Sequence, residues 1–347
     1  MPALAIADAL RASGATISFL GTEDRAEARL VPDAGYEIDF LGVRGLDRGN
    51  PIRAAAALAR AAAAVPQARR LLRERGADVV MGAGGYVAGP AGLGALASRV
   101  PLVLTEADGH LGLTNRMLAG RARRVCLAFA IEGRDSERYL VTGRPVPAAV
   151  LNANREAARE RYGISPSERC LLVFGGSLGA RSINEAALAA FANTGSEREF
   201  HVLHITGSRD YAVASERLRT ADAERYTLLE YEPSLGDPLA ASDLVLARAG
   251  GSVFELAAAG RPAILVPYPH ASARHQHSNA AWMANAGAAV VVEDDEMTPD
   301  GLAELAGSLL SYPARLVSMS EAARSLARPD AAEQIAAEVL AACGAPR

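Results

Sequence analysis

The sequence contains no lysine, so all 36 basic residues are arginine. A Walker A phosphate loop needs a Gly-Lys pair to reach the phosphates of a nucleotide, and its absence excludes a P-loop nucleoside triphosphatase. Alanine is abundant beside arginine, a bias that is typical of a GC-rich genome. Runs of arginine therefore say little about function.

Cysteine is scarce as well. The three cysteines, Cys126, Cys170 and Cys343, are widely spaced and odd in number, which excludes a disulfide framework and a Cys-x-x-Cys metal site. The six histidines show no pair at the spacing of metal ligands. We therefore expect reduced, mostly buried thiols and no metal centre.

Two further features are missing. No uninterrupted apolar run reaches about 18 residues, which excludes a membrane-spanning helix. The N-terminus lacks the basic start, apolar stretch and cleavage site of a secretory signal, so we expect the chain to stay in the cytoplasm. Half of the 347 residues are apolar, enough to fill the two domain cores that this length suggests.

Short β-rich runs alternate with helical stretches, a pattern typical of parallel α/β units. In the first half we expect strands at 16–20, 37–42, 78–82, 101–105 and 124–129, and helices at 2–12, 52–75, 90–98 and 112–121. In the second half we expect strands at 170–174, 201–205, 226–231, 243–247, 262–267 and 289–292. The proline-containing segment 143–150 indicates a boundary between two Rossmann-like domains, 1–145 and 146–347, with the ligand site in the cleft between them.

The first domain opens in an unusual way. A doubly wound domain normally begins with a central strand and a glycine loop, whereas here the helical stretch 2–12 comes first. We expect that this domain lacks its N-terminal strand and glycine loop and that the coding frame continues upstream of Met1. Because the loss of a central strand exposes two sheet edges, we also expect marginal stability for this domain.

Two glycine turns stand out in the second domain. Residues Gly175–Arg181 follow an apolar strand and open a helix, so their amides and the Ser177 hydroxyl suit a diphosphate. Residues 250–251 lie at the start of another helix, and Glu255 follows one turn later, where it suits a ribose diol. Two alternatives stay open: a tight strand-to-helix turn at the first site, and a capping box between Ser252 and Glu255, which those residues alone favour.

A polar cluster follows the second turn. Its members are His270, Arg274, His275, Gln276 and Asn279. Gln276 and Asn279 share one helical face, and neutral amides suit sugar hydroxyls. For each histidine a surface or capping role is equally consistent with the sequence.

The acidic run 293–296 has two readings, a cation site of the Asp-x-Asp kind and a solvated turn. We favour the turn, because two helix starts and Arg248 already neutralise a diphosphate.

Arginine is concentrated in the first domain. Residues 52–75 hold six arginines and one glutamate, and residues 1–147 carry 19 arginines against 15 acidic residues, whereas residues 148–347 carry 17 against 25. A basic amphipathic face of this kind can lie against anionic lipid, although the arginine bias explains it equally well. The first domain has a similar glycine turn, Gly82–Pro90, after the expected strand 78–82. It is either a phosphate-type turn or a close packing contact.

Taken together, these segments resemble the bacterial MurG family, glycosyltransferase family 28, through nearly the whole chain. The matching segments are Phe19–Thr22, Asp24–Arg25, Leu30–Pro32, Gly82–Pro90, Glu106, Gly112–Arg116, Gly175–Arg181, Arg248–Gly260 and Pro267–Asn279. The resemblance implies the GT-B fold and an inverting transfer, without metal or cofactor, of GlcNAc from UDP-GlcNAc to the C4 hydroxyl of MurNAc in lipid I. The product would be lipid II, made for peptidoglycan synthesis by a peripheral enzyme on the cytoplasmic face of the membrane, with no nucleic-acid partner.

The resemblance also implies site residues. The donor-binding set is Ser177, Arg248, Gly251, Ser252, Glu255, His275, Gln276 and Asn279, and the acceptor-side set is Gly84, Gly85, Tyr86, Glu106, Asn115 and Arg144. Within the donor set, Ser177 and the amides near Gly251 and Ser252 would bind the diphosphate. Glu255 would bind the ribose, and Gln276 with Asn279 would bind the GlcNAc hydroxyls. The backbone near Tyr231 would recognise uracil. Negative charge gathers on the leaving UDP, and fixed amides that point at it stabilise the transition state.

The chain departs from the family pattern at the catalytic base. The family loop Gly-Gly-Thr-x-Gly-His, whose histidine is one candidate for the base, is absent, which leaves Asp108 and His110 as speculative replacements. Arg144 stands in a linker that differs from that of the family. Two rival functions therefore stay open: another UDP-sugar transferase, and a non-catalytic scaffold that binds UDP-sugars.

Overall fold

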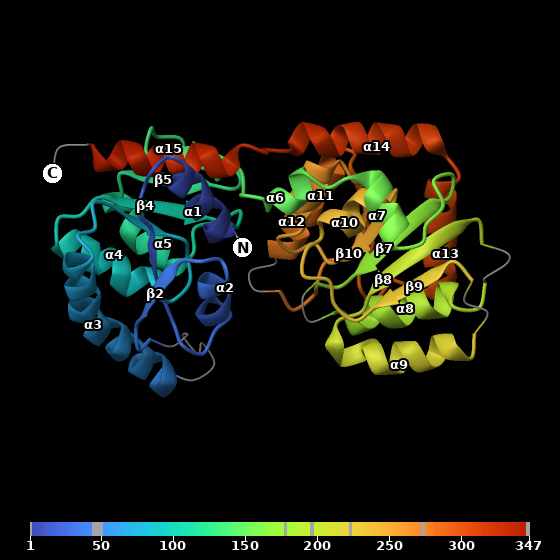
Figure 1. Cartoon of the computed structure of the whole chain (residues 1–347), viewed down its shortest axis with the longest axis horizontal. Coiled ribbons are helices and arrows are strands. Elements are labelled where there is room, and N and C mark those ends of the chain that lie inside the picture. Colours follow the sequence, from blue (N-terminus) through green and yellow to red (C-terminus); the bar gives the residue numbers. More distant parts are fainter. Residues whose placement is uncertain are drawn as a thin grey trace. The chain divides into compact units, whose positions relative to one another are not determined.

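The computed structural model describes residues 2–43, 51–176, 179–194, 198–221, 224–271 and 275–344. The chain divides into two compact units, Met1–Pro145 with Asp330–Arg347, and Val146–Pro329. Each unit is built from parallel strands and helices (Figure 1). The α/β fold class predicted from the sequence is therefore confirmed.

The second unit contains a six-stranded parallel sheet in the order β12-β11-β10-β7-β8-β9. Its strands are β7 (Arg169–Phe174), β8 (Phe200–Ile205), β9 (Tyr226–Leu229), β10 (Leu244–Ala247), β11 (Ala263–Leu265) and β12 (Ala289–Val291). Its helices are α6 (Ala148–Leu151), α7 (Arg155–Arg161), α8 (Arg181–Phe191), α9 (Ser208–Arg219), α10 (Gly236–Ala241), α11 (Val253–Ala259), α12 (His275–Asn285), α13 (Pro299–Leu310) and α14 (Pro313–Leu326). Every residue of β8, β10 and β11 is buried, as expected for a parallel sheet covered on both faces.

The strand order of this sheet reverses at β7. The chain runs from β7 outward to β8 and β9, and then returns to the other side of β7 with β10. The loops that follow β7 and β10 therefore leave neighbouring strand ends. Such a reversal point is where open α/β sheets bind their ligands.

The first unit contains two separate parallel sheets, β1-β2 and β3-β4-β5-β6. Their strands are β1 (Ser18–Gly21), β2 (Glu37–Phe40), β3 (Val80–Gly82), β4 (Leu102–Glu106), β5 (Arg124–Leu127) and β6 (Tyr139–Val141). The helices are α1 (Pro2–Ala12), α2 (Glu27–Asp33), α3 (Pro51–Glu74), α4 (Ala88–Ala97), α5 (Leu113–Leu118), the 3-10 turn η1 (Ala119–Arg121) and α15 (Ala331–Cys343). Every predicted strand is present within two residues at each end, while α2 and β6 are additional.

The C-terminal helix corrects the predicted domain limit. The sequence predicts that residues 146–347 form one domain, but α15 packs on α1, β4 and β5 of the first unit. Ile335 and Val339 share a buried cluster with Ile6 and Leu10. An apolar helical stripe shows that a helix is covered but not which sheet covers it, so the sequence could not decide this point.

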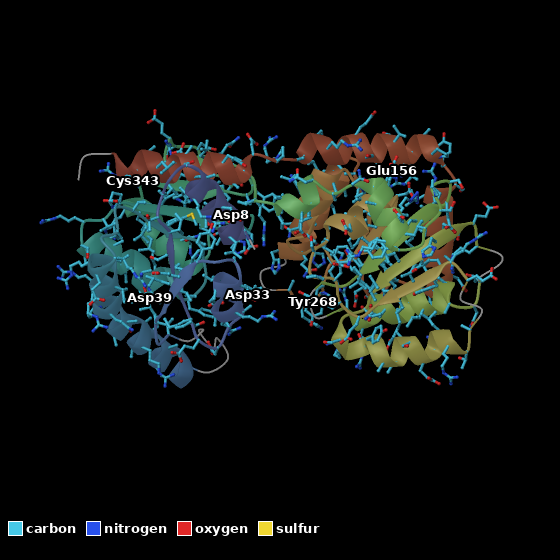
Figure 2. All side chains as sticks on the ribbon, in the orientation of Figure 1. Asp8, Asp33, Asp39, Glu156, Tyr268 and Cys343 are labelled. Atoms are coloured by element: carbon cyan, nitrogen blue, oxygen red, sulfur yellow. The ribbon has the colours of Figure 1, made fainter. Side chains whose placement is uncertain are left out.

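The thiols lie largely as predicted. Cys126 and Cys170 are free and buried, whereas Cys343 is free and exposed on α15 (Figure 2). Burial raises the pKa of both buried thiols to about 12, so neither is a thiolate near neutral pH.

We expect the first unit to unfold before the second. Within the described residues no ladder joins β1 to β3, so each of these strands has one unpaired edge, whereas the second unit has a continuous six-stranded sheet. In pulse proteolysis across a urea gradient, fragments of residues 1–145 should disappear at a lower urea concentration than fragments of residues 146–329. Loss of both sets at one concentration would contradict this expectation.

Candidate nucleotide-sugar site

The loop after β7 rests closely on the end of β8. A Cβ atom on Gly175 would lie 2.2 Å from the Ala180 nitrogen, and one on Gly179 would lie 2.0 Å from the carbonyl oxygen of Thr206. Gly179 also has a φ of 74°. Side chains are excluded at both glycines, so this path requires them. Ser177, which the sequence assigns to the diphosphate, lies outside the described residues.

The loop after β10 leads directly into α11. The amides of Val253 and Phe254 donate to the carbonyls of Gly250 and Gly251, both at 3.3 Å. Ser252 is the N-cap residue, but its side chain makes no capping hydrogen bond. The reciprocal capping box between Ser252 and Glu255, the alternative that those residues alone favour, is therefore not formed.

Arg248 joins the two glycine loops. Its guanidinium donates to the Ser182 hydroxyl at the start of α8 (2.8 Å) and pairs with Asp294 Oδ1 (2.5 Å). The Ser182 hydroxyl donates in turn to Asp294 at 2.8 Å. Arg248 also donates to the carbonyls of Val266 and Pro267, both at 3.3 Å. The arginine that the sequence assigns to the donor is thus buried and paired with a carboxylate.

The acidic run 293–296 is only partly the solvated turn that the sequence predicts. Residues Asp295 and Glu296 are exposed. Asp294, however, is bound to Arg248 and Ser182, and Glu293 Oε2 lies 3.2 Å from His277 Nε2. Spacing along the chain could not reveal these contacts, because the partners come from three other elements. Among the described residues, no group of three or more His, Cys, Asp or Glu side chains could hold a metal ion.

The amides on α12 hold the same loops. Asn279 is buried, and its Nδ2 donates to the carbonyls of Ala249 (3.0 Å) and Gly250 (3.4 Å). Its Oδ1 is buried without a hydrogen-bond partner among the described residues. Gln276 Oε1 accepts from the Tyr268 amide at 2.9 Å. Both side chains therefore order the backbone of the site. His275, at the start of α12, and Glu255, on α11, are half-buried.

A buried polar chain lies beneath the first loop. Asn184 Nδ2 donates to the Thr206 carbonyl (3.0 Å) and to Asp210 (2.9 Å), so its Oδ1 is the acceptor for His204 Nε2 at 3.0 Å. His204 Nδ1 then accepts from the Tyr226 hydroxyl at 2.7 Å. Complete burial lowers the pKa of His204 to about 3 and keeps it neutral. The sequence analysis did not predict this row of hydrogen-bonded side chains, although a histidine inside an apolar strand was a signal for it.

In the first unit, Glu106 shapes the loop after β4. Its carboxylate accepts from the amides of Ala107 (3.0 Å), Asp108 (3.3 Å) and Gly112 (2.8 Å), and from Asn115 Nδ2 (2.9 Å). Glu106 and Asn115, two of the six predicted acceptor-side residues, are buried. They fix the loop that carries Asp108, which is half-buried, and His110, which is exposed.

The loop after β3 contains two glycines in the left-handed region of backbone conformation. Gly84 and Gly85 have φ values of 82° and 75°, a conformation that favours glycine. Tyr86 is exposed, and the Arg25 guanidinium lies 5.8 Å from its ring centre. Arg144, the last of the predicted acceptor-side residues, is half-buried next to the boundary between the units.

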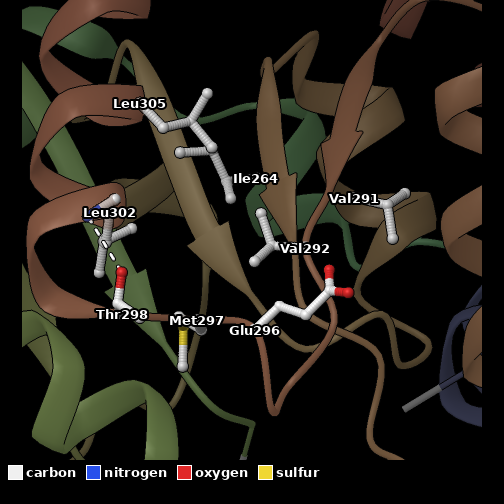
Figure 3. Close-up of a pocket in the computed structure, with 9 residues that line it drawn as sticks. Ile264, Val291, Val292, Glu296, Met297, Thr298, Leu302 and Leu305 are labelled. Carbon is white, nitrogen blue, oxygen red and sulfur yellow. Dashed lines mark hydrogen bonds between the residues drawn. The ribbon is translucent and has the colours of Figure 1, made fainter.

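Two hollows in the second unit are not formed by the glycine loops. One, of about 200 Å³, lies between β11, β12 and α13 and is mostly apolar (Figure 3). Its only charged lining residue is Glu296, and Thr298 is used to cap α13 at the Gly301 amide (3.2 Å). The other, of about 570 Å³, lies at the amino ends of β7, β8 and β9, whereas the loops follow the carboxyl ends. The loops therefore remain the candidate site.

Comparison with known proteins identifies the class. Residues 1–127 match the glycosyltransferase family 28 N-terminal domain, and residues 170–335 match the glycosyltransferase family 28 C-terminal domain. The fold and the family domains are those of a two-domain GT-B hexosyltransferase. The chain belongs to glycosyltransferase family 28.

Two similar proteins carry the same name, UDP-N-acetylglucosamine--N-acetylmuramyl-(pentapeptide) pyrophosphoryl-undecaprenol N-acetylglucosamine transferase. The protein from Moorella thermoacetica is 39% identical over 350 residues, covering 98% of this chain and 94% of its own. The protein from Aeromonas hydrophila is 42% identical over 339 residues, covering 97% and 92%. The crystal structure of Acinetobacter baumannii MurG superposes with a TM-score of 0.79 at 31% identity, covering 98% of this chain and 95% of that one.

The buried histidine leads to a prediction on acid stability. The pKa of His204 is about 3 in the folded state and near 6.5 in the unfolded state, so the unfolded chain binds more protons between these values. His204 should therefore cost about 1.4 kcal/mol of stability per pH unit as the pH falls below about 6. We expect His204→Asn to flatten the fall in unfolding free energy between pH 6.5 and 5, measured by urea denaturation.

The exposed His110→Asn variant is the control, and it should keep the wild-type slope. An unchanged slope in His204→Asn would show that the buried histidine is not the group responsible.

Proposed function

We propose that this protein transfers GlcNAc, with inversion, from UDP-GlcNAc to the C4 hydroxyl of MurNAc in lipid I, and so makes lipid II for peptidoglycan. The observation that carries the proposal is the meeting of two glycine loops at the reversal point of the second sheet, joined through Arg248 and Ser182. Membership in family 28 and the name shared by the relatives support the same donor and acceptor.

The donor would lie across the two loops. Ser177 and the backbone near Gly251 and Ser252 would face the diphosphate, and Glu255 would accept hydrogen bonds from the ribose. His275, Gln276 and Asn279 would contact the sugar, for which the unpartnered Oδ1 of Asn279 is a ready acceptor. Tyr231 follows β9 at the same end of the sheet, where its backbone would read uracil.

In the reaction, the C4 oxygen of the acceptor attacks the anomeric carbon while the bond from that carbon to the UDP oxygen breaks. Negative charge then gathers on the diphosphate. Backbone amides that are already fixed in the two loops can stabilise this charge without reorganising, so the step needs no metal. The acceptor proton would pass to a base on the loop that Glu106 orders, where Asp108 and His110 are the candidates.

We also propose that the protein is peripheral, on the cytoplasmic face of the membrane. Among the described residues no helix is both long and apolar enough to cross a bilayer. Large apolar side chains are nevertheless exposed around α4 and α5: Tyr86, Leu93, Leu113 and Met117. Leu113 and Met117 share one face of α5, and Arg116 and Arg121 are exposed beside them. Apolar insertion combined with attraction of arginine to anionic lipid suits such a surface.

The donor half of the proposal is tested by calorimetric titration with UDP-GlcNAc. We expect Glu255→Ala to weaken binding at least about tenfold, because a carboxylate that bonds a ribose diol contributes about 1.5–3 kcal/mol. Glu321→Ala, an exposed glutamate on α14, is the matched control. UDP-GalNAc and ADP-glucose should compete poorly.

Turnover of lipid I then separates a transferase from a UDP-sugar-binding scaffold. Absence of donor binding by a folded second unit would reject the proposed function.

The membrane surface is tested by sedimentation with vesicles that contain anionic lipid. We expect the double variant Leu113→Glu with Met117→Glu to lose at least about tenfold in vesicle affinity, because each carboxylate would enter an apolar and negatively charged interface. Titration of UDP-GlcNAc should be unchanged. Val213→Glu and Val317→Glu, on exposed sites of the second unit, form the matched control and should bind vesicles like the wild type.

A further inference from the structure

We propose that Asp294 is a positioning residue for the donor diphosphate. This proposal rests on the function proposed above. Asp294 would act through Arg248 and Ser182, by holding the loop after β7 and the loop after β10 at the spacing of one diphosphate. The three side chains form a closed triangle, in which Asp294 Oδ1 accepts from both partners at 2.5 Å and 2.8 Å and Arg248 donates to Ser182 at 2.8 Å.

The triangle joins three elements that are distant in the sequence. Ser182 stands three residues after Gly179, and Arg248 stands two residues before Gly250. Asp294 comes from the turn between β12 and α13, at the edge of the sheet. The two glycine loops are thus tied to each other and to a third point, so neither can shift alone while the triangle is intact.

The burial of Arg248 makes its contacts with Asp294 and Ser182 necessary. Arg248 is 8% exposed, and a buried guanidinium is stable only when its charge is balanced and its donors are used. Asp294 supplies the balancing charge, and the carbonyls of Val266 and Pro267 with the Ser182 hydroxyl take further donors. A charge that is already balanced in this way contributes less to neutralising a phosphate than a free arginine does. The arrangement therefore points to a role in loop position.

The neighbours of Asp294 in the acidic run do not share this arrangement. Glu293 faces His277, and the side chains of Asp295 and Glu296 are exposed. Asp295 has the same chemistry as Asp294 and differs only in its surroundings. Asp295→Ala is therefore the matched control for Asp294→Ala.

If Asp294 positions the two loops, its substitution should weaken binding of the diphosphate part of the donor and leave binding of the uridine part intact. The two loops meet the diphosphate, which UDP contains and uridine lacks. Asp294→Ala should weaken UDP binding in calorimetry at least about tenfold while uridine binding, followed by ligand-observed NMR, stays within about twofold. In turnover the loss should fall mainly on the KM for UDP-GlcNAc. Asp294→Asn, which keeps the acceptor oxygen without its charge, should lie between Asp294→Ala and the wild type.

The outcomes separate this proposal from the proposed function. If the wild type fails to bind UDP, both are overturned. If the wild type binds UDP and Asp294→Ala binds it as well as Asp295→Ala does, only the positioning role is overturned. Equal loss of UDP and uridine binding would also overturn it, because that result indicates general damage to the unit. Should Asp294→Ala fail to fold, Ser182→Ala removes the two contacts of the Ser182 hydroxyl, leaves only the Arg248–Asp294 pair, and must show the same preferential loss of UDP.

Discussion

The position of β10 beside β7, instead of beside β9, is the constraint on which the candidate site of the second unit depends. Because the strands are parallel, this order brings the carboxyl ends of β7 and β10 together and makes their two glycine loops neighbours. Gly175 and Gly179 let the first loop lie on Ala180 and Thr206 without a clash. The short contacts of Arg248 then become possible across the reversal point.

A common pattern links the two units. Polar side chains near the strand ends are turned inward and hold backbone: Glu106 collects three loop amides and Asn115, Asn279 holds two loop carbonyls, and Asn184 supports the Thr206 carbonyl. Loops fixed in this way present their own backbone groups to a ligand in a set geometry. Electrostatic preorganisation of this kind is how a site stabilises developing charge at little cost in reorganisation.

The sequence predicted the positions of strands well, but it did not predict which elements pack together or how side chains are oriented. Strands such as β7 and β10 were predicted because runs of apolar, β-favouring residues bounded by glycine are a local signal. The assignment of α15 to the second domain was wrong, because an amphipathic helix does not specify the sheet that it covers. The capping box, an alternative that residues 252–255 alone favoured, is not formed, since such a residue pattern is compatible with more than one side-chain geometry.

The sequence by itself determined the parallel α/β class, the positions of the strands and glycine turns, and the family resemblance, because all of these depend on residue types at short and regular spacing. Only the tertiary structure decided which polar groups meet. The pairing of Arg248 with Asp294 and the neutral chain through His204 join residues from separate elements. Their energies depend on burial and on distances of about 3 Å, which arise only when the sheet order brings the elements together.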